Sequence, residues 1–362
     1  MKIGVDGSRA FKKERTGVEE YAYQIIRQWA KIWKDREILL YLRRGQEWQI
    51  DFPLGKKWRI RFIAWDNFWT QAGLSWEMLR EAPDRFFSPS HVIPLIHPIS
   101  VMTVHGLEYE HSPESYSRFS RGLHRFLIKN GCRWSRKIIA VSEKTKKDLI
   151  DFYQIPKEKI QVIHNGVSVP EKREWQKRRE EIKKNRYLFF IGRMEKRKNV
   201  MGVIEVFEIL KKKYHYSGQL ILAGKPGYGY CEIKKRIKES AYRKEIVEKG
   251  FVSEKEKWEL LAGADAVLYP SFSEGFGLPI LEAQKMGVPI VASDIPSSRE
   301  VAGRSDFLFA PENSQGMAKM LNQILTDEVF RQKMLIDGQK NAQKFSWEKC
   351  AYETARVILE EE

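Results

Sequence analysis

The sequence predicts an α/β protein with two doubly wound domains. Short apolar runs alternate with helical patterns along the whole chain, which is typical of repeated βαβ units and parallel sheets. With 362 residues, of which 42% are apolar, the chain is long enough for two buried cores. An almost entirely charged stretch separates two halves of similar pattern. We therefore expect domains at residues 1–170 and 187–345, joined by a charged linker at residues 171–186.

The first half opens with a clear βαβ pattern. Residues 3–5 predict a short buried strand, residues 8–17 a polar loop and residues 18–33 an amphipathic helix. The residues expected on the apolar face of this helix are Tyr21, Ile25, Trp29 and Ile32. The further strands expected in this half are residues 38–42, 60–64, 101–104, 138–141 and 160–163.

The second half repeats this pattern after the charged linker. A strand at residues 187–191 is followed by a helix at 200–212 and a strand at 219–223. Two more strands are expected at residues 289–292 and 266–269. The final segment, residues 346–362, is helical and amphipathic, and it either closes the second domain or crosses back to the first.

The most informative motif lies between two predicted strands of the second half. A glycine-rich loop leads into a short helix, and exposed N–H groups at a helix N-terminus favour a phosphate. Glu274 is expected in the loop, and Glu282 in the first turn of the helix, both facing the same cleft. Alternatively, Glu282 only complements the helix dipole and the glycines only shape a turn.

Cations follow another predicted strand of the second half. Arg193 and Lys198 lie between residues 187–191 and the next helix, at the end of a parallel strand where α/β sheets bind ligands. The planar fork of Arg193 and the compact charge of Lys198 both suit phosphate oxygens. The alternative is a solvated basic turn. The glycines of residues 224–229 do not form the dinucleotide fingerprint.

Two positions of the first half are further candidates. Gly17 lies in a turn directly before the first helix, which makes it a possible anion site. His105 ends a predicted buried strand, where its side chain would be exposed to a ligand. A lone histidine at such a position is also often structural.

Four segments resemble the GT4 family of retaining glycosyltransferases. They are TGVEEYA from Thr16, VIHNGV from Val162, GRMEKRKN from Gly192, and EGFGLPILEAQKMGVPIVASD from Glu274. The resemblance spans nearly the whole chain and implies the GT-B fold, in which two Rossmann-like domains face each other across a cleft. It implies that residues 1–170 contact the acceptor and that residues 187–345 bind the donor nucleotide.

The resemblance also implies a role for each candidate residue. Arg193 and Lys198 would hold the donor diphosphate, and Glu282 the ribose. His105 and Glu274 would act at the transferred sugar. The other residues implied to contact the donor are Gly17 on the phosphate side, Gly275, Phe276, Gly277 and Leu278 at sugar and phosphate, and Val252 and Ser253 at the base. Many members of the family have an aspartate where this chain has Gly106, which leaves His105 without an obvious orienting neighbour.

The resemblance implies a metal-independent retaining transferase without a cofactor. It would move a hexose, mannose or glucose, from a donor such as GDP-mannose or UDP-glucose to a hydroxyl of a glycan or lipid-linked acceptor. Arg193, Lys198 and a helix N-terminus would replace the charge of a divalent ion. The formal net charge of +16 alone also suits a nucleic-acid-binding protein, but no recognition motif supports that alternative. Another enzyme class, a nicotinamide dehydrogenase, would require the fingerprint GxGxxG, which this sequence lacks.

Composition narrows the location of the protein. The three cysteines are far apart and no CxxC occurs, so we expect free thiols in the cytoplasm. The first residues lack the apolar core of a signal peptide, and no run of about 18 apolar residues occurs. Between Arg118 and Lys147, ten basic residues accompany the single acidic residue Glu143. This segment predicts either peripheral contact with an anionic membrane or a core helix with a solvated basic face.

Overall fold

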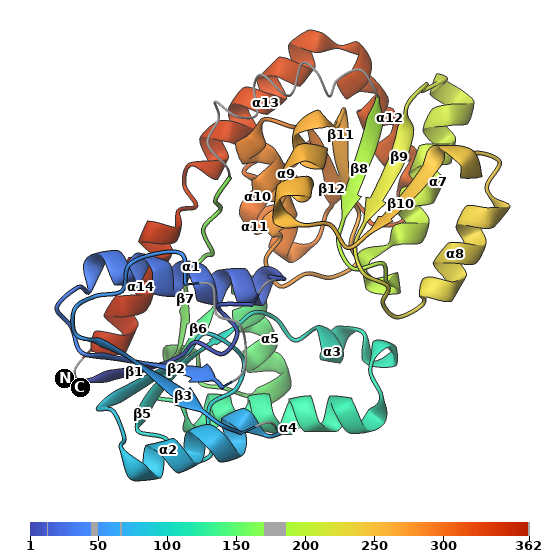
Figure 1. The fold of residues 1–362 in the computed structure, drawn as a ribbon. Coiled ribbons are helices and arrows are strands. Elements are labelled where there is room, and N and C mark those ends of the chain that lie inside the picture. Colours follow the sequence, from blue (N-terminus) through green and yellow to red (C-terminus); the bar gives the residue numbers. More distant parts are fainter. Residues whose placement is uncertain (13, 45–49, 66, 170–185, 361–362) are drawn as a thin grey trace. The chain divides into compact units, whose positions relative to one another are not determined.

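The computed structural model describes the chain except residues 13, 45–49, 66, 170–185 and 361–362. The chain forms two compact units (Figure 1). The first unit contains Met1–Gly166 together with Ser346–Glu362, and the second contains Val167–Phe345. Nearly all of the predicted linker, residues 171–186, lies outside the described residues.

The first unit is built on a seven-stranded parallel sheet with the strand order β3-β2-β1-β4-β5-β6-β7. Sequence analysis missed β4, a four-residue strand that begins with a charged arginine, although it pairs with β1 near the middle of the sheet. The strands are β1 (Ile3–Asp6), β2 (Ile38–Arg43), β3 (Trp58–Ile63), β4 (Arg85–Ser88), β5 (Ile99–Val104), β6 (Lys137–Ala140) and β7 (Ile160–Val162).

Helices cover both faces of this sheet. The main α-helices are α1 (Gly17–Ile32), α2 (Ser75–Arg80), α4 (Arg118–Trp134), α5 (Glu143–Tyr153) and α14 (Trp347–Leu359). The short helical turns are η1 (Trp69–Leu74), α3 (Glu108–His111), η2 (Pro113–Ser115) and η3 (Lys157–Lys159). Alternate side chains of β2 point to opposite faces: Leu40 packs in the core under α1 and α14, whereas Leu39 packs under η1 and α2.

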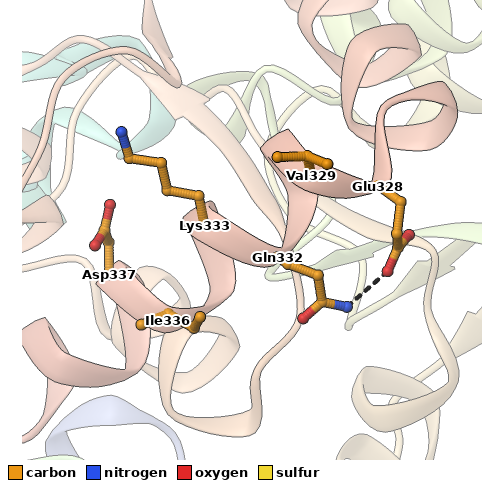
Figure 2. Close-up of a pocket in the computed structure, with 6 residues that line it drawn as sticks. All are labelled: Glu328, Val329, Gln332, Lys333, Ile336 and Asp337. Carbon is orange, nitrogen blue, oxygen red and sulfur yellow. Dashed lines mark hydrogen bonds between the residues drawn. The ribbon is translucent and has the colours of Figure 1, made fainter.

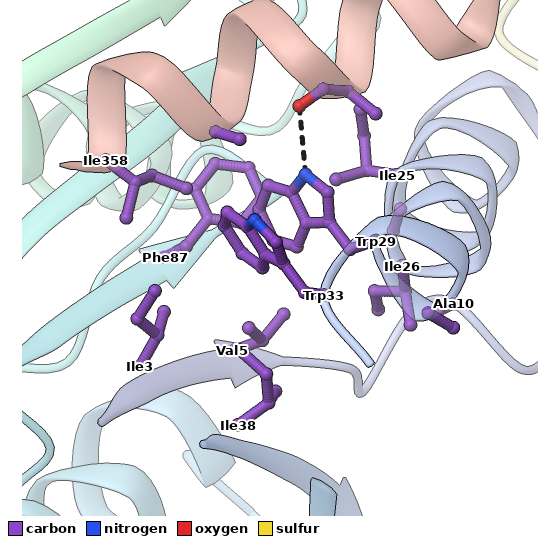
Figure 3. Close-up of a cluster of buried hydrophobic side chains, with 14 of the residues drawn as sticks. Ile3, Val5, Ala10, Ile25, Ile26, Trp29, Trp33, Ile38, Phe87 and Ile358 are labelled. Carbon is purple, nitrogen blue, oxygen red and sulfur yellow. Dashed lines mark hydrogen bonds between the residues drawn. The ribbon is translucent and has the colours of Figure 1, made fainter. Parts of the chain in front are cut away.

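The core under α1 and α14 joins segments from both ends of the described chain (Figure 3). Trp29 stacks on Trp33 with ring centroids 4.6 Å apart, and its indole N–H donates to the carbonyl of Ala351 at 2.9 Å. Ile32 was expected on the buried face of α1, but it is 53% exposed. The helix ends at this residue, and Trp33 fills the core in its place.

The second unit is built on a six-stranded parallel sheet with the order β10-β9-β8-β11-β12-β13. Its strands are β8 (Tyr187–Ile191), β9 (Gln219–Ala223), β10 (Ile246–Gly250), β11 (Ala266–Tyr269), β12 (Ile290–Ser293) and β13 (Leu308–Phe309). Its helices are η4 (Lys196–Lys198), α7 (Val200–Tyr214), α8 (Tyr230–Glu239), η5 (Arg243–Glu245), α9 (Glu254–Gly263), α10 (Leu278–Met286), α11 (Pro296–Ala302), α12 (Ser314–Thr326) and α13 (Glu328–Ala342). The prediction of two doubly wound α/β domains is therefore confirmed.

Candidate active site

Two of the charged candidates of the second unit, Lys198 and Glu274, meet at the carboxyl ends of β8 and β11. These strands are parallel neighbours, and the order of the sheet reverses between them, which is where α/β sheets form ligand sites. The loop after β8 carries Lys198, and the loop after β11 carries Glu274. Their side chains are in contact, with 2.5 Å between Lys198 Nζ and Glu274 Oε1.

Two more charges join this pair. Arg197 Nη1 lies 3.4 Å from Glu274 Oε2, and Arg197 Nη2 donates to Glu195 Oε1 at 2.8 Å. The side chains of Lys198, Glu274 and Arg197 are only 12%, 9% and 14% exposed. The site is thus a buried network of two cations and two carboxylates, and sequence analysis identified only Lys198 and Glu274 as its members.

Burial and ion pairing act in opposite directions on this network. Burial disfavours the charged form of Glu274, but Lys198 and Arg197 outweigh it and lower the pKa of this carboxyl to about 2. Burial lowers the pKa of Lys198, although the carboxylate of Glu274 opposes the shift. Glu274 is therefore ionised at physiological pH, and two cations balance its negative charge.

The glycine-rich loop ends at the N-terminus of α10. Gly277 has φ 109°, a left-handed conformation that favours glycine, and it directly precedes Leu278, the first residue of the helix. Within the described residues, no side chain caps this end of α10. In the same loop, the ring of Phe276 is buried, and the buried hydroxyl of Ser273 has no hydrogen-bond partner in the described structure. A helix N-terminus of this kind offers its N–H groups to an anion.

Glu282 does not lie where sequence analysis expected it. It is the fifth residue of α10 and therefore lies in the second turn, because the helix begins at Leu278. Its carboxylate pairs with Lys257 of α9, at 2.9 Å from Nζ. Sequence analysis missed Lys257, which lies 25 positions from Glu282 and is brought to it by the packing of α9 against α10.

The remaining candidates of the second unit lie on neighbouring loops. Arg193 follows β8; it is exposed and forms no ion pair within the described parts of the chain. The loop after β9 contacts the end of β10, since Gly224 N–H donates to the carbonyl of Gly250, the last residue of that strand, at 2.7 Å. Val252 is buried directly after this contact, and the Ser253 hydroxyl caps α9 by accepting from the Glu256 N–H at 3.2 Å.

In the first unit, Gly17 is the first residue of α1. The preceding residue, Thr16, forms a capping box with Glu19, which satisfies N–H groups at this helix end. Glu19 also pairs with Arg9 at 3.3 Å and Lys12 at 3.2 Å. The carboxylate two residues after Gly17 therefore already holds two cations.

His105 follows β5, also in the first unit. Its Nε2 lies 2.8 Å from the carbonyl of Pro89, which favours the tautomer that donates from Nε2. Its backbone N–H donates to Nδ1 of His91 at 3.3 Å. Burial lowers the pKa of His105 to about 4, so the ring is neutral at physiological pH. Pro89 supplies the orienting contact that Gly106 cannot, and no local sequence signal pointed to Pro89 or His91.

A shallow hollow on the outer face of α13 contains none of these residues. Figure 2 shows its lining, which comes from this single helix: Glu328, Val329, Gln332, Lys333, Ile336 and Asp337. Among the residues that the structure describes, no group of three or more His, Cys, Asp or Glu is arranged to hold a metal ion.

Both units match known protein families. Residues 171–344 match the family described as "Glycosyl transferases group 1", and residues 15–170 match "Glycosyltransferase Family 4". The O-antigen chain mannosyltransferase B of Escherichia coli is 34% identical over 168 residues, which are 46% of this chain and 44% of that protein. The O-antigen chain mannosyltransferase RfbU of Salmonella typhimurium is 26% identical over 243 residues, which are 67% and 65% of the two chains. The chain thus spans less than half of mannosyltransferase B.

Solved structures share the fold of the whole chain. The structure of Anabaena Alr3699/HepE in complex with UDP and glucose matches with a TM-score of 0.73 at 20% identity, over 99% of both chains. WaaG, a glycosyltransferase involved in lipopolysaccharide biosynthesis, matches with a TM-score of 0.73 at 17% identity, over 99% of this chain and 100% of the other.

Proposed function

Because the chain belongs to the glycosyltransferases described by these two families and has their GT-B fold, we propose that it transfers a hexose from a nucleoside diphosphate sugar to a hydroxyl of a glycan or lipid-linked acceptor. The observation that carries this proposal is the buried contact of Lys198 with Glu274 beside the uncapped N-terminus of α10. Mannose and glucose are the favoured sugars, with GDP-mannose or UDP-glucose as the donor. Two of the similar proteins described above are mannosyltransferases.

The chemistry proposed for the donor is stabilisation of the leaving group. Breaking the anomeric bond leaves negative charge on the diphosphate and positive charge on the sugar ring. The cations Lys198 and Arg193, together with the N-terminus of α10, would stabilise the diphosphate without a divalent ion or another cofactor. The N–H groups of Phe276, Gly277 and Leu278 would help to hold the sugar and the phosphate, with Gly275 beside them. Glu282, paired with Lys257, would accept from the ribose hydroxyls, and Val252 and Ser253 would lie at the base.

Retention of configuration is part of the same proposal. Glu274 is held between two cations, which lowers its basicity and makes it a weak nucleophile. We assign Glu274 to orienting the sugar hydroxyls and favouring the positive charge on the ring. Because no protein nucleophile takes part, the acceptor would attack from the face that the diphosphate leaves. A donor phosphate oxygen would take the proton of the acceptor. His105, which is neutral, would contact the transferred sugar, and Gly17 would lie on the phosphate side.

Binding of the donor can be tested without knowing the acceptor. GDP, UDP, ADP and NAD are added separately, and the thermal unfolding temperature is measured. A nucleoside diphosphate at 100 times its Kd is expected to stabilise the protein by about 2.7 kcal/mol. The matched variants are Lys198→Met, which should lose this effect, and Arg236→Met, which breaks an ion pair with Glu208 on α7 and should keep it. Stabilisation by NAD alone would contradict the proposal.

We also propose that the first unit contacts anionic lipid through residues 118–147, at the cytoplasmic face of a membrane. No helix in the described residues is long and apolar enough to cross a bilayer. Helix α4 buries only Ile128, Gly131 and Cys132, whereas Phe119 is 81% and Phe126 57% exposed. Exposed apolar side chains among cations are what an interfacial helix needs.

Neighbouring elements extend this apolar surface. The cores under α2 and under α4 lie on the same face of the sheet, opposite α1. The segment after β4 links them, because Ile93 packs in the core with Ile128, and the Leu95 N–H donates to Ser75 Oγ at 3.0 Å. The exposed apolar residues of α2 and this segment are Trp76, Leu79, Leu95 and Ile96.

Liposome flotation tests the lipid contact. The double variant Phe119→Ser/Phe126→Ser is expected to lose binding to vesicles that contain anionic lipid. The matched control, Val329→Ser/Ile336→Ser, removes two exposed apolar side chains from α13 of the second unit and should bind as the unchanged protein does. Equal recovery of the unchanged protein with neutral and anionic vesicles would contradict the lipid proposal.

A further inference from the structure

The proposed function gives Lys198 two partners that it cannot hold equally well. In the structure its ammonium lies 2.5 Å from Glu274, and the Tyr269 hydroxyl accepts from it at 3.4 Å. To hold a diphosphate, the ammonium must shift towards a ligand with at least two negative charges. Glu274 would then lose its closest cation in a buried position, where an unpaired carboxylate is costly.

Arg197 is placed to keep Glu274 in position during this shift. Its Nη1 donates to the carbonyl of Ser273 at 2.7 Å and lies 3.4 Å from Glu274 Oε2. Its own carbonyl accepts from the Phe272 N–H at 2.9 Å. Arg197 therefore holds three consecutive residues of the glycine-rich loop, by two main-chain contacts and one ion pair.

Glu195 explains why Arg197 would not follow Lys198 to the diphosphate. Its carboxylate accepts from Arg197 Nη2 at 2.8 Å, on the nitrogen that does not face Glu274. Both side chains are largely buried, which strengthens this contact relative to one in water. The planar guanidinium can bridge Glu195, Ser273 and Glu274 at once, whereas the single ammonium of a lysine cannot reproduce this fork.

We propose that Arg197 is a positioning residue that keeps Glu274 and its loop in place when Lys198 passes from Glu274 to the donor diphosphate. This inference rests on the proposed function, since it needs a diphosphate ligand. Arg197 acts through Glu274 and does not itself touch the donor. Its loss should therefore affect turnover much more than nucleotide binding.

The test compares Arg197→Met and Arg197→Lys with the control Arg236→Met. Turnover is measured as release of nucleoside diphosphate from GDP-mannose or UDP-glucose, with water as the acceptor, and Kd is measured for GDP or UDP. Arg197→Met is expected to lower kcat by about 100-fold, because a displacement of about 1 Å near the reacting atoms has an effect of that size. Its Kd for the free diphosphate should change by no more than about two-fold. Arg197→Lys should recover part of kcat, and Arg236→Met should change neither constant.

A double variant shows whether Arg197 acts through Glu274. Arg197→Met added to Glu274→Gln should lower kcat little further, since residues that act as a unit are not additive. An unchanged kcat in Arg197→Met, an equal loss of diphosphate affinity, or additive losses in the double variant would each overturn the inference. If Arg197→Met does not fold, the same criteria apply to Arg197→Lys. If the unchanged protein binds none of GDP, UDP and ADP, the proposed function itself is overturned instead.

Discussion

Neutralising Glu274 should destabilise the second unit far more than neutralising Glu282. Glu274→Gln removes the carboxylate that pairs with two buried cations. Glu282 instead pairs with Lys257, and the side chains of Glu282 and Lys257 are both more exposed than those of Glu274 and Lys198. The pKa of Glu274 falls from an ordinary value of 4.5 to about 2 on folding. At about 1.4 kcal/mol for each pKa unit, the charged form contributes about 3 kcal/mol to the free energy of unfolding. Breaking a buried ion pair from one side costs a similar amount.

The dependence on pH gives this prediction a sign. Because the pKa of Glu274 is lowered in the folded state, its stabilisation is complete above pH 4.5 and is lost as the pH falls towards 2. The difference between the unchanged protein and Glu274→Gln should be about 3 kcal/mol at pH 7 and about 2 kcal/mol at pH 3.5. Urea unfolding at both pH values measures it, with Glu282→Gln as the matched control at about 1 kcal/mol or less. Equal losses in the two variants at pH 7, or a difference that grows on acidification, would refute the reasoning.

Three further predictions concern activity and the first unit. In steady-state kinetics, Glu282→Gln should mainly raise the donor KM, because the ribose contact is the same in ground and transition states. The rise should correspond to a loss of about 1.5–3 kcal/mol of donor binding free energy. Glu274→Gln should mainly lower kcat, and a normal kcat with weakened diphosphate binding would reverse the two roles. Turnover should persist in excess EDTA, and a complete loss restored by Mg²⁺ or Mn²⁺ would contradict metal independence. Because the folded state favours the neutral ring of His105, the contribution of this residue to the free energy of unfolding should be complete above pH 6.5 and fall by about 3 kcal/mol by pH 4. Urea unfolding of His105→Asn and of the unchanged protein, above pH 6.5 and at pH 4, measures this contribution. A difference between the two proteins that does not change with pH would contradict the lowered pKa.

The parts of the fold predicted from sequence are those that local pattern determines. Strands β8, β9 and β11 have the predicted bounds, because each is a short, mostly apolar run bounded by polar residues, glycine or proline. Strand β10 was missed, since Glu248 and Lys249 interrupt its apolar pattern and its pairing with β9 stabilises it. Tertiary pairing of this kind has no local signal.

The site shows the same division. Sequence analysis placed Lys198 and Glu274 each in a loop after a predicted parallel strand, but it did not predict that these two strands are neighbours, which is what brings the side chains into contact. The pairing of Glu282 with Lys257 depends on how two helices pack, and the contact of His105 with Pro89 depends on two loops 16 positions apart. These geometries require the folded backbone.

Helix α14 has a consequence for the order in which the protein folds during synthesis. The core that contains Trp29 also contains Trp347 and Ile358, and the indole of Trp29 donates to a carbonyl of α14. Residues 1–166 and the whole second unit are therefore synthesised before α14, which the first unit needs to complete its core. We expect the second unit to become protease-resistant on nascent chains that still lack α14, while the first unit, although synthesised earlier, matures last.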